Sequence, residues 1–142
     1  RHPCDCVLSS FMYEFTPNHA MIQTRDLQRC ARLYDRSMEL YEVSRAAMPF
    51  IPVHQMRYED LLKDQRGETK KILDFLGLPW NENVMDFDKA SREGKFISTP
   101  SAGQVTEKLY TSSSYRWLRY REQLAPVLPI LEPWVKKFGY EM

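Results

Sequence analysis

One stretch of the sequence is unusually rich in positive charge. Residues 89–121 contain only two glutamates but seven basic residues, which are Lys89, Arg92, Lys95, Lys108, Arg116, Arg119 and Arg121. Within it, TPSAGQVTEKLYTSSSYRW (residues 99–117) adds hydroxyl groups and a glycine. Cations combined with hydroxyl and backbone N–H donors are the groups that bind anions. The stretch is therefore a candidate anion-binding loop, and a basic surface loop without a ligand is the alternative.

A second candidate site lies in RHPCDCVLS, residues 1–9. Pro3 suits the first position of a helix, so Arg1 would precede that helix and Ser9 would lie about two turns inside it. The N–H groups of a helix N-terminus, a neighbouring arginine and a hydroxyl can together bind a phosphate. The simpler alternative is a solvated arginine and a serine that bonds to its own helix.

A third candidate is Tyr58 in RYED, residues 57–60. The preceding residues alternate between two faces, which predicts one strand over 53–58. Ligands of open α/β sheets bind at the carboxyl ends of strands, so Tyr58 would be placed to stack on a flat ring. Packing in the core is the alternative role for this side chain.

Helices dominate the rest of the pattern. Apolar residues at helical spacing predict a short buried helix at 3–15 and a long amphipathic helix from about 18 to 47. A further helix at 67–76 should end at Gly77, since Pro79 follows, and a short helical turn is expected around ENVMDF. Residues 86–111 show neither the helical nor the strand period. One strand cannot satisfy the hydrogen-bonding groups of its own backbone, so we expect partner strands outside this chain.

The final helical region should begin in the cluster Ser112 to Ser114, with a serine as N-cap, and run past Trp117, Tyr120 and Leu124. Two prolines then interrupt it. LPILEPWVKKFGY, residues 128–140, predicts the last helix.

The composition is that of a folded domain without a strong electrostatic preference. The 142 residues are 43% apolar, 13% aromatic and 27% charged, as in a single globular domain. A net charge of +1 gives the whole molecule no attraction to nucleic acid or anionic lipid, so any anion site must be local. The cysteines and histidines lack zinc-site spacing, and reduced thiols fit a cytoplasmic protein. Short apolar stretches broken by prolines predict no membrane span.

Taken in order, the three segments resemble the nucleotide-binding elements of sulfotransferases that use 3′-phosphoadenosine 5′-phosphosulfate (PAPS). The resemblance is to the branch of tyrosylprotein sulfotransferases and bacterial sulfotransferases with tetratricopeptide repeats. An arginine and a serine eight residues later bind the 3′-phosphate in that family, which implies this role for Arg1 and Ser9. A tyrosine in a motif similar to RYEDL lies at the adenine, which implies that role for Tyr58. FLGLPW, residues 75–80, follows as in bacterial members.

The basic loop also resembles an element of this family. SAGQV, residues 101–105, is similar to the S-x-x-Q-V loop that closes over the nucleotide, and Arg116 precedes a tryptophan twelve positions after Gln104. The resemblance implies that Ser101 is catalytic and helps to stabilise the transferring sulfonate. It implies that Gln104 and Arg116 line the nucleotide, and Lys108 is added for its charge and its place in the loop.

The chain departs from the family pattern in two respects. The family's glycine-rich 5′-phosphosulfate loop, its general base and a further catalytic basic residue precede the first motif, and this sequence holds none of them. Tyr13 stands where tyrosylprotein sulfotransferases have a second arginine. We therefore expect residues 1–142 to be the C-terminal portion of a single sulfotransferase domain, inactive without its N-terminal part.

The resemblance implies an α/β protein with the P-loop-like sulfotransferase fold, of which this part is mostly helical with one or two short strands. The implied enzyme is bacterial and cytoplasmic, and it transfers a sulfonate from PAPS to a hydroxyl or amine of a small-molecule or protein acceptor without a metal. A non-catalytic helical module that binds phosphorylated or acidic partners through the basic loop is the alternative. Nucleic-acid binding is not expected, because the net charge is near zero and a basic recognition helix is lacking.

Overall fold

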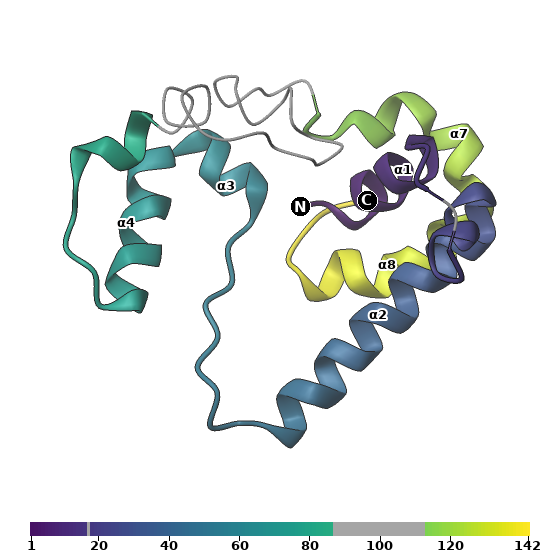
Figure 1. The fold of residues 1–142 in the computed structure, drawn as a ribbon. Helices are drawn as coiled ribbons and strands as arrows, with labels where there is room; N and C mark the ends of the chain where they lie inside the picture. Colours follow the sequence, from purple (N-terminus) through teal and green to yellow (C-terminus); the bar gives the residue numbers. More distant parts are fainter. Residues whose placement is uncertain (17, 87–112) are drawn as a thin grey trace. The chain divides into compact units, whose positions relative to one another are not determined.

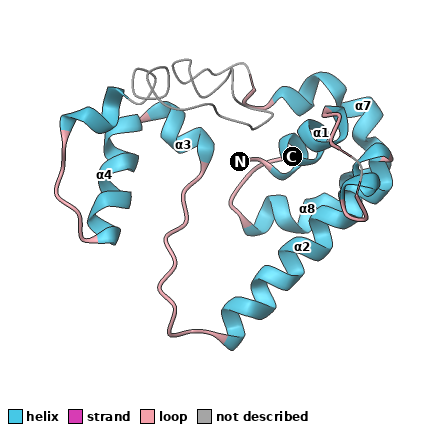
Figure 2. Ribbon diagram, in the orientation of Figure 1, coloured by secondary structure: helices cyan, strands magenta, loops and turns pink. Residues whose placement is uncertain are grey.

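The computed structural model describes residues 1–16, 18–86 and 113–142 (Figure 1). The chain divides into two compact units, of which unit 1 comprises Arg1–Val53 and Ser112–Met142 and unit 2 comprises His54–Thr111. Within the described residues every regular element is a helix (Figure 2). As far as the structure describes them, both units are assemblies of helices.

The strand expected at residues 53–58 is not confirmed. Residues 52–57 belong to neither a helix nor a strand, and α3 (Tyr58–Lys63) begins at the last residue of the expected strand. An alternating pattern makes a segment suitable for a sheet, but a strand forms only where a second strand accepts and donates its backbone hydrogen bonds.

The first helices of unit 1 begin where local signals place them. The helix α1 (Pro3–Met12) starts at Pro3, as predicted, and ends before residue 15. The predicted start of the long helix at residue 18 is wrong, because α2 (Leu27–Ala47) begins after Asp26, whose side chain accepts a hydrogen bond from the backbone of Arg29 at 2.8 Å. The 3₁₀ helix η1 (Met21–Arg25) precedes that cap.

The C-terminal segment completes unit 1 with short helices. These are η3 (Arg116–Tyr120), α7 (Arg121–Leu124), η4 (Ala125–Val127) and α8 (Leu128–Lys137). The helix α8 packs against both α1 and α2 (Figure 1). Apolar residues of these three helices and of the other C-terminal segments form one buried core, made of Cys4, Val7, Leu8, Cys30, Ala31, Trp117, Leu124, Val127, Leu131, Val135 and Tyr140.

Polar contacts at the edge of this core join α2 to α8. The indole Nε1 of Trp134 donates to Asp35 Oδ1 at 2.7 Å, and Lys137 Nζ lies 2.7 Å from Glu42 Oε2. Segments from the two ends of the chain are thus held together by hydrogen bonds as well as by apolar burial.

Unit 2 contains α3, α4 (Gln65–Leu76) and η2 (Glu82–Asp86). The predicted end of α4 is confirmed, since Gly77 adopts the left-handed conformation at φ +68° and its N–H closes the last turn. Arg66 forms two hydrogen bonds with Glu82, at 2.6 and 3.0 Å, and its guanidinium carbon lies 4.7 Å from the ring centroid of Trp80. These contacts fold the segment after α4 back onto the first turn of that helix.

Candidate functional site

The N-terminus of α1 is capped by a fully buried histidine. His2 Nδ1 accepts a hydrogen bond from the backbone N–H of Cys4 at 3.2 Å, and His2 Nε2 lies 3.0 Å from the carbonyl oxygen of Glu141. A neutral imidazole with its proton on Nε2 satisfies both contacts, because Nδ1 then accepts and Nε2 donates. One side chain thus caps α1 and holds the C-terminal segment against it.

Asp5 in the first turn of α1 is also buried and reaches a distant part of the chain. Its Oδ1 accepts a hydrogen bond from the backbone N–H of Trp117 at 2.8 Å. Trp117 is the second residue of η3, and the N-cap of η3, Tyr115, makes no side-chain cap. An N-cap side chain normally accepts from the second or third helical N–H, so Asp5 serves η3 as a cap supplied by another helix. The prediction of a serine N-cap is therefore wrong.

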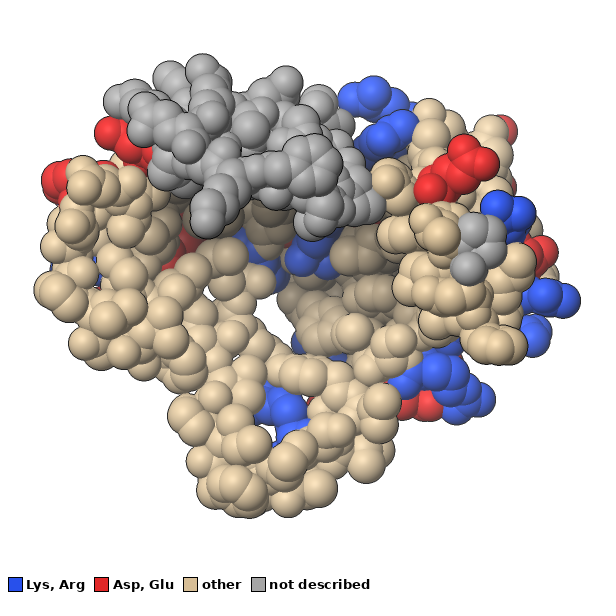
Figure 3. Space-filling view, viewed as in Figure 1, with Lys and Arg blue, Asp and Glu red and all other residues tan. Residues whose placement is uncertain are grey.

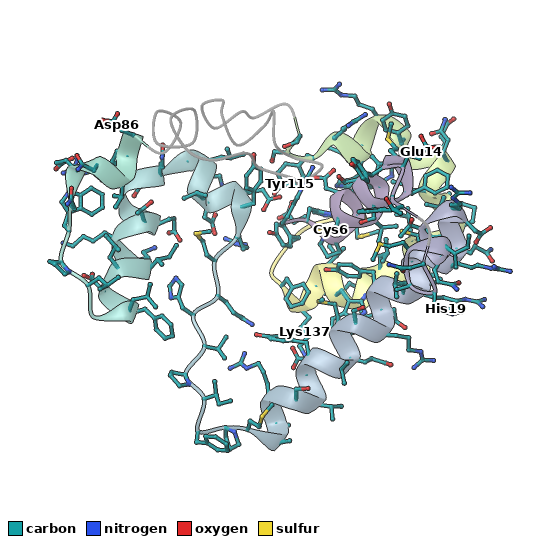
Figure 4. All side chains as sticks on the ribbon, in the orientation of Figure 1. Cys6, Glu14, His19, Asp86, Tyr115 and Lys137 are labelled. Atoms are coloured by element: carbon teal, nitrogen blue, oxygen red, sulfur yellow. The ribbon has the colours of Figure 1, made fainter. Side chains whose placement is uncertain are left out.

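Arg1 joins the same two segments of unit 1. Its Nη2 donates to the carbonyl oxygen of Ser113 at 2.8 Å. Between these anchors Tyr115 has φ +53°, a left-handed conformation that costs a non-glycine residue about 1 kcal/mol or more. Its ring contacts His2 at a centroid distance of 5.6 Å, beside the start of α1 (Figure 4). The contacts on either side of Tyr115 hold the turn in this conformation.

Arg116 follows that turn and is half-buried. Its guanidinium carbon lies 5.9 Å from the ring centroid of Tyr120. The next residue, Trp117, is buried, with its ring stacked on His2 at 5.0 Å and the guanidinium of Arg121 5.5 Å from its centroid. Two guanidinium groups therefore lie beside aromatic rings in η3 and α7, an arrangement in which cations are attracted to the ring faces.

Ser9 is exposed and lies one helical turn after Asp5, so the two residues share a face of α1. Three of the predicted nucleotide-binding residues, Arg1, Ser9 and Arg116, thus belong to unit 1 and to two segments that Asp5 joins directly. Their binding of a nucleotide stays a prediction. Their chemistry, two guanidinium groups and a hydroxyl, suits a phosphate.

The other predicted residues lie elsewhere. Tyr58 is the first residue of α3 in unit 2 and is half-buried. In the same turn Arg57 Nε donates to Asp60 Oδ2 at 2.6 Å, and this hydrogen bond lowers the pKa of Asp60. Ser101, Gln104 and Lys108 fall outside the described residues. The convergence of all these groups on one ligand therefore also stays a prediction.

Burial sets the electrostatics of Asp5. Loss of solvent raises the pKa of its carboxyl, while the backbone N–H groups of Trp117 and Tyr115 and the charge of Arg1 act in the opposite direction. A carboxylate close to a phosphate site would repel the ligand. Burial favours the neutral carboxyl, which would not repel the ligand, whereas the hydrogen bond from Trp117 and the charge of Arg1 favour the carboxylate.

The cysteines are free thiols, and two of them are chemically inert. Burial raises the pKa of Cys4 to about 12 and that of Cys30 to about 11, so neither forms a thiolate at neutral pH. The described ranges contain no group of three histidine, cysteine or acidic residues placed to hold a metal ion. None of the helices in these ranges has the length and apolar character needed to cross a bilayer.

Sequence patterns did not reveal the residues that organise this site. No motif assigns a role to His2 or Asp5. Their side chains contact backbone atoms more than a hundred positions away, at Glu141 and Trp117. The one local signal is that an acidic residue in the first turn favours a helix N-terminus, which does not identify its partner. On the face of unit 1 shown in Figure 3, basic and acidic side chains are interspersed.

A family model described as "Sulfotransferase family" matches residues 1–82, more than half of the chain. The chain belongs to the sulfotransferase family. The matched range contains Arg1, Ser9 and Tyr58, while Arg116 lies beyond it. This sulfotransferase-family chain is also 26% identical, over 138 residues, to a protein named "Uncharacterized protein" from Aquifex aeolicus (strain VF5). That match covers 96% of the chain and 18% of the relative, so the chain spans under a fifth of the relative's length. No solved structure matches.

Family membership supports a P-loop-like fold for the domain to which these residues belong. The described part is mostly helical and contains no strand. Helices that flank a sheet and the sheet itself are separate layers of α/β proteins, so a helical segment is compatible with that fold.

Proposed function

We propose that this chain carries the nucleotide-binding elements of a PAPS-dependent sulfotransferase. In this proposal Arg1 and Ser9 bind the 3′-phosphate, and Arg116 adds a second cation to the same group. The observation that supports it is the direct tie between α1, which carries Ser9, and the segment that carries Arg116, through the 2.8 Å hydrogen bond from Trp117 to Asp5. Family membership supplies the reaction class.

The roles of the other residues at the site follow from the resemblance to PAPS-dependent sulfotransferases. Tyr58 would stack on the adenine, Gln104 and Lys108 would line the nucleotide, and Ser101 would donate a hydrogen bond to the transferring sulfonate. Sulfonate transfer, like phosphoryl transfer, depends on alignment of donor and acceptor and on neutralisation of charge on the leaving oxygen. The acceptor in this proposal is a hydroxyl or amine of a small molecule or protein, and the part of the domain that precedes Arg1 supplies the 5′-phosphosulfate loop and the general base.

The nucleotide site is tested by titration of adenosine 3′,5′-bisphosphate into the full-length protein in a calorimeter. Ser9→Ala is the cleanest variant, because Ser9 is exposed and its loss should leave the fold intact. A hydrogen bond to a charged group contributes about 1.5 to 3 kcal/mol, so we expect affinity to fall about tenfold or more. Arg1→Ala should lower affinity by at least as much.

Arg36→Ala is the matched control, since Arg36 is an exposed arginine of unit 1 that pairs with Glu39 on α2. Its affinity for the bisphosphate should equal that of the wild type. Arg1 also donates to Ser113, so each variant needs a melting temperature. Unchanged affinity in both Ser9→Ala and Arg1→Ala would contradict the assignment of the 3′-phosphate site. Transfer of labelled sulfonate from PAPS to a panel of acceptors tests the reaction itself.

A further inference from the structure

Asp5 is a buried acid that none of the sulfotransferase motifs in this sequence explains. Its side chain is 1% exposed, and in unit 1 it links α1 to a backbone N–H that is 112 positions away. Removing a carboxylate from water is costly, and an apolar residue could fill the same space without that cost. The hydrogen bond of a buried acid in such a place should therefore have a role that an apolar residue could not fulfil.

That hydrogen bond fixes the orientation of the backbone from which the side chain of Arg116 projects. The N–H of Trp117 and the Cα of Arg116 belong to one planar peptide unit, so fixing the N–H fixes the plane from which Arg116 projects. Two further features restrict the same peptide. The Trp117 ring is stacked on His2, and Tyr115, on the other side of Arg116, is held at φ +53°. Asp5 is the part of this arrangement that contacts the peptide itself.

The same acid also lies beside the proposed phosphate ligands. Ser9 is one turn further along the same face of α1, and the charge of Arg1 acts on the Asp5 carboxyl. We infer that Asp5 is a positioning residue, which orients Arg116 toward the 3′-phosphate held by Arg1 and Ser9. This inference rests on the proposed function and adds a residue that does not contact the nucleotide.

A merely structural role predicts something different. If Asp5 only stabilises unit 1, its removal lowers the melting temperature and affects binding equally, whatever residue stands at position 116. If it acts through Arg116, its effect on affinity disappears once the guanidinium is gone. A double-mutant cycle separates these two cases.

The cycle measures the affinity of full-length protein for adenosine 3′,5′-bisphosphate in the wild type, Asp5→Ala, Arg116→Ala and the double variant. We expect each single change to weaken binding about tenfold. In the Arg116→Ala background, Asp5→Ala should lower affinity by less than about a further twofold. Asp5→Asn should bind within about threefold of the wild type, because its Oδ1 can still accept from Trp117.

Asp35→Ala is the matched control, since Asp35 also accepts a hydrogen bond from a tryptophan of unit 1, at 2.7 Å, but between α2 and α8. It should lower the melting temperature and leave affinity unchanged. Equal effects of Asp5→Ala in both backgrounds would overturn the inference and leave the nucleotide site standing. No binding by the wild type would overturn the proposed function as well.

A second measurement needs only the wild type, in case Asp5→Ala does not fold. Coupling between sites is reciprocal, so a nucleotide that uses Arg116 should stabilise the bond that orients it. We expect saturating bisphosphate to slow amide exchange of Trp117 about tenfold relative to the amides of α8. Equal slowing at both places would overturn the inference.

Discussion

At the scale of single residues, unit 1 depends on polar groups that have been removed from water. His2 is a neutral cap held by a donor and an acceptor contact, and Asp5 accepts a backbone N–H in a place where burial opposes its charge. Both side chains bind to main-chain atoms. Such contacts depend on where the backbone of the partner lies, and at Trp117 that position also depends on the ring, which is buried and stacked on His2.

Asp5 should make the stability of the protein depend on pH. Its pKa in the folded state is raised by burial above the ordinary value of 3.8, so the folded state holds the proton more tightly than the unfolded state. The free energy of unfolding of the wild type should therefore fall, relative to that of Asp5→Asn, as the pH rises above about 4. Urea unfolding of both proteins at several pH values measures the difference. A difference that is constant or grows in favour of the wild type contradicts the assignment.

The three thiols should differ in reactivity. Cys4 and Cys30 are buried, and burial raises their pKa to about 12 and about 11, while Cys6 is only half-buried. Alkylation by iodoacetamide at about pH 8 should modify Cys6 first in the folded protein, because the reagent needs both access and thiolate. Peptide mapping with and without urea gives the order. Equal rates for Cys6 and Cys30 in the folded state would show that the core around Cys30 opens easily.

At the scale of helices, strong local signals at the termini determine where several elements begin and end. Pro3 begins α1, Asp26 caps α2 and Gly77 ends α4. The start of η3 shows the limit of such signals, because this helix takes its cap from Asp5 on another helix. Propensity places an element boundary well only where the residues that satisfy the end are neighbours in sequence.

Gly77 allows a test of the cap of α4. A Cβ at this position would meet no atom within 4 Å, so the cost of Gly77→Ala comes from the backbone at φ +68° alone. We expect a loss of about 1 kcal/mol, which accelerates amide exchange in the last turn of α4 about fivefold. Gly77→Asn should cost less, because asparagine tolerates this conformation better. Similar exchange in Gly77→Ala and the wild type would mean that the cap contributes little.

At the scale of the whole chain, unit 1 is assembled from two segments that are far apart in sequence. Its core combines α1 and α2 with residues after position 112, and hydrogen bonds cross between the segments at His2, Asp5 and Asp35. The segment between them includes all of unit 2. Continuity of the chain is therefore not what holds the core of unit 1 together.

A single cut should leave that core associated. Phe50 is 79% exposed in the stretch that follows α2, which makes it a site for limited digestion by chymotrypsin. The pieces 1–50 and 51–142 should still elute together in size-exclusion chromatography under native conditions and separate in denaturant, because α8 packs on α1 and α2. Separation without denaturant would show that the contacts between the segments are too weak to maintain unit 1.

The sequence allowed much of the helical organisation to be predicted and less of the site. The C-terminal end of α4 and the start of α1 followed from glycine and proline. The strand at 53–58 was predicted from alternation, which cannot report whether a partner strand exists. The contacts of Asp5 with Trp117 and of His2 with Glu141 were beyond prediction, because nothing local connects positions that far apart.

The divided core of unit 1 also has a consequence for biosynthesis. The helix α8 leaves the ribosome about 80 residues after α2, and at about 5 to 20 residues per second the delay is several seconds. During that interval the apolar faces of α1 and α2 have no counterpart to cover them. Newly made chains should therefore bind chaperones until the last helix emerges.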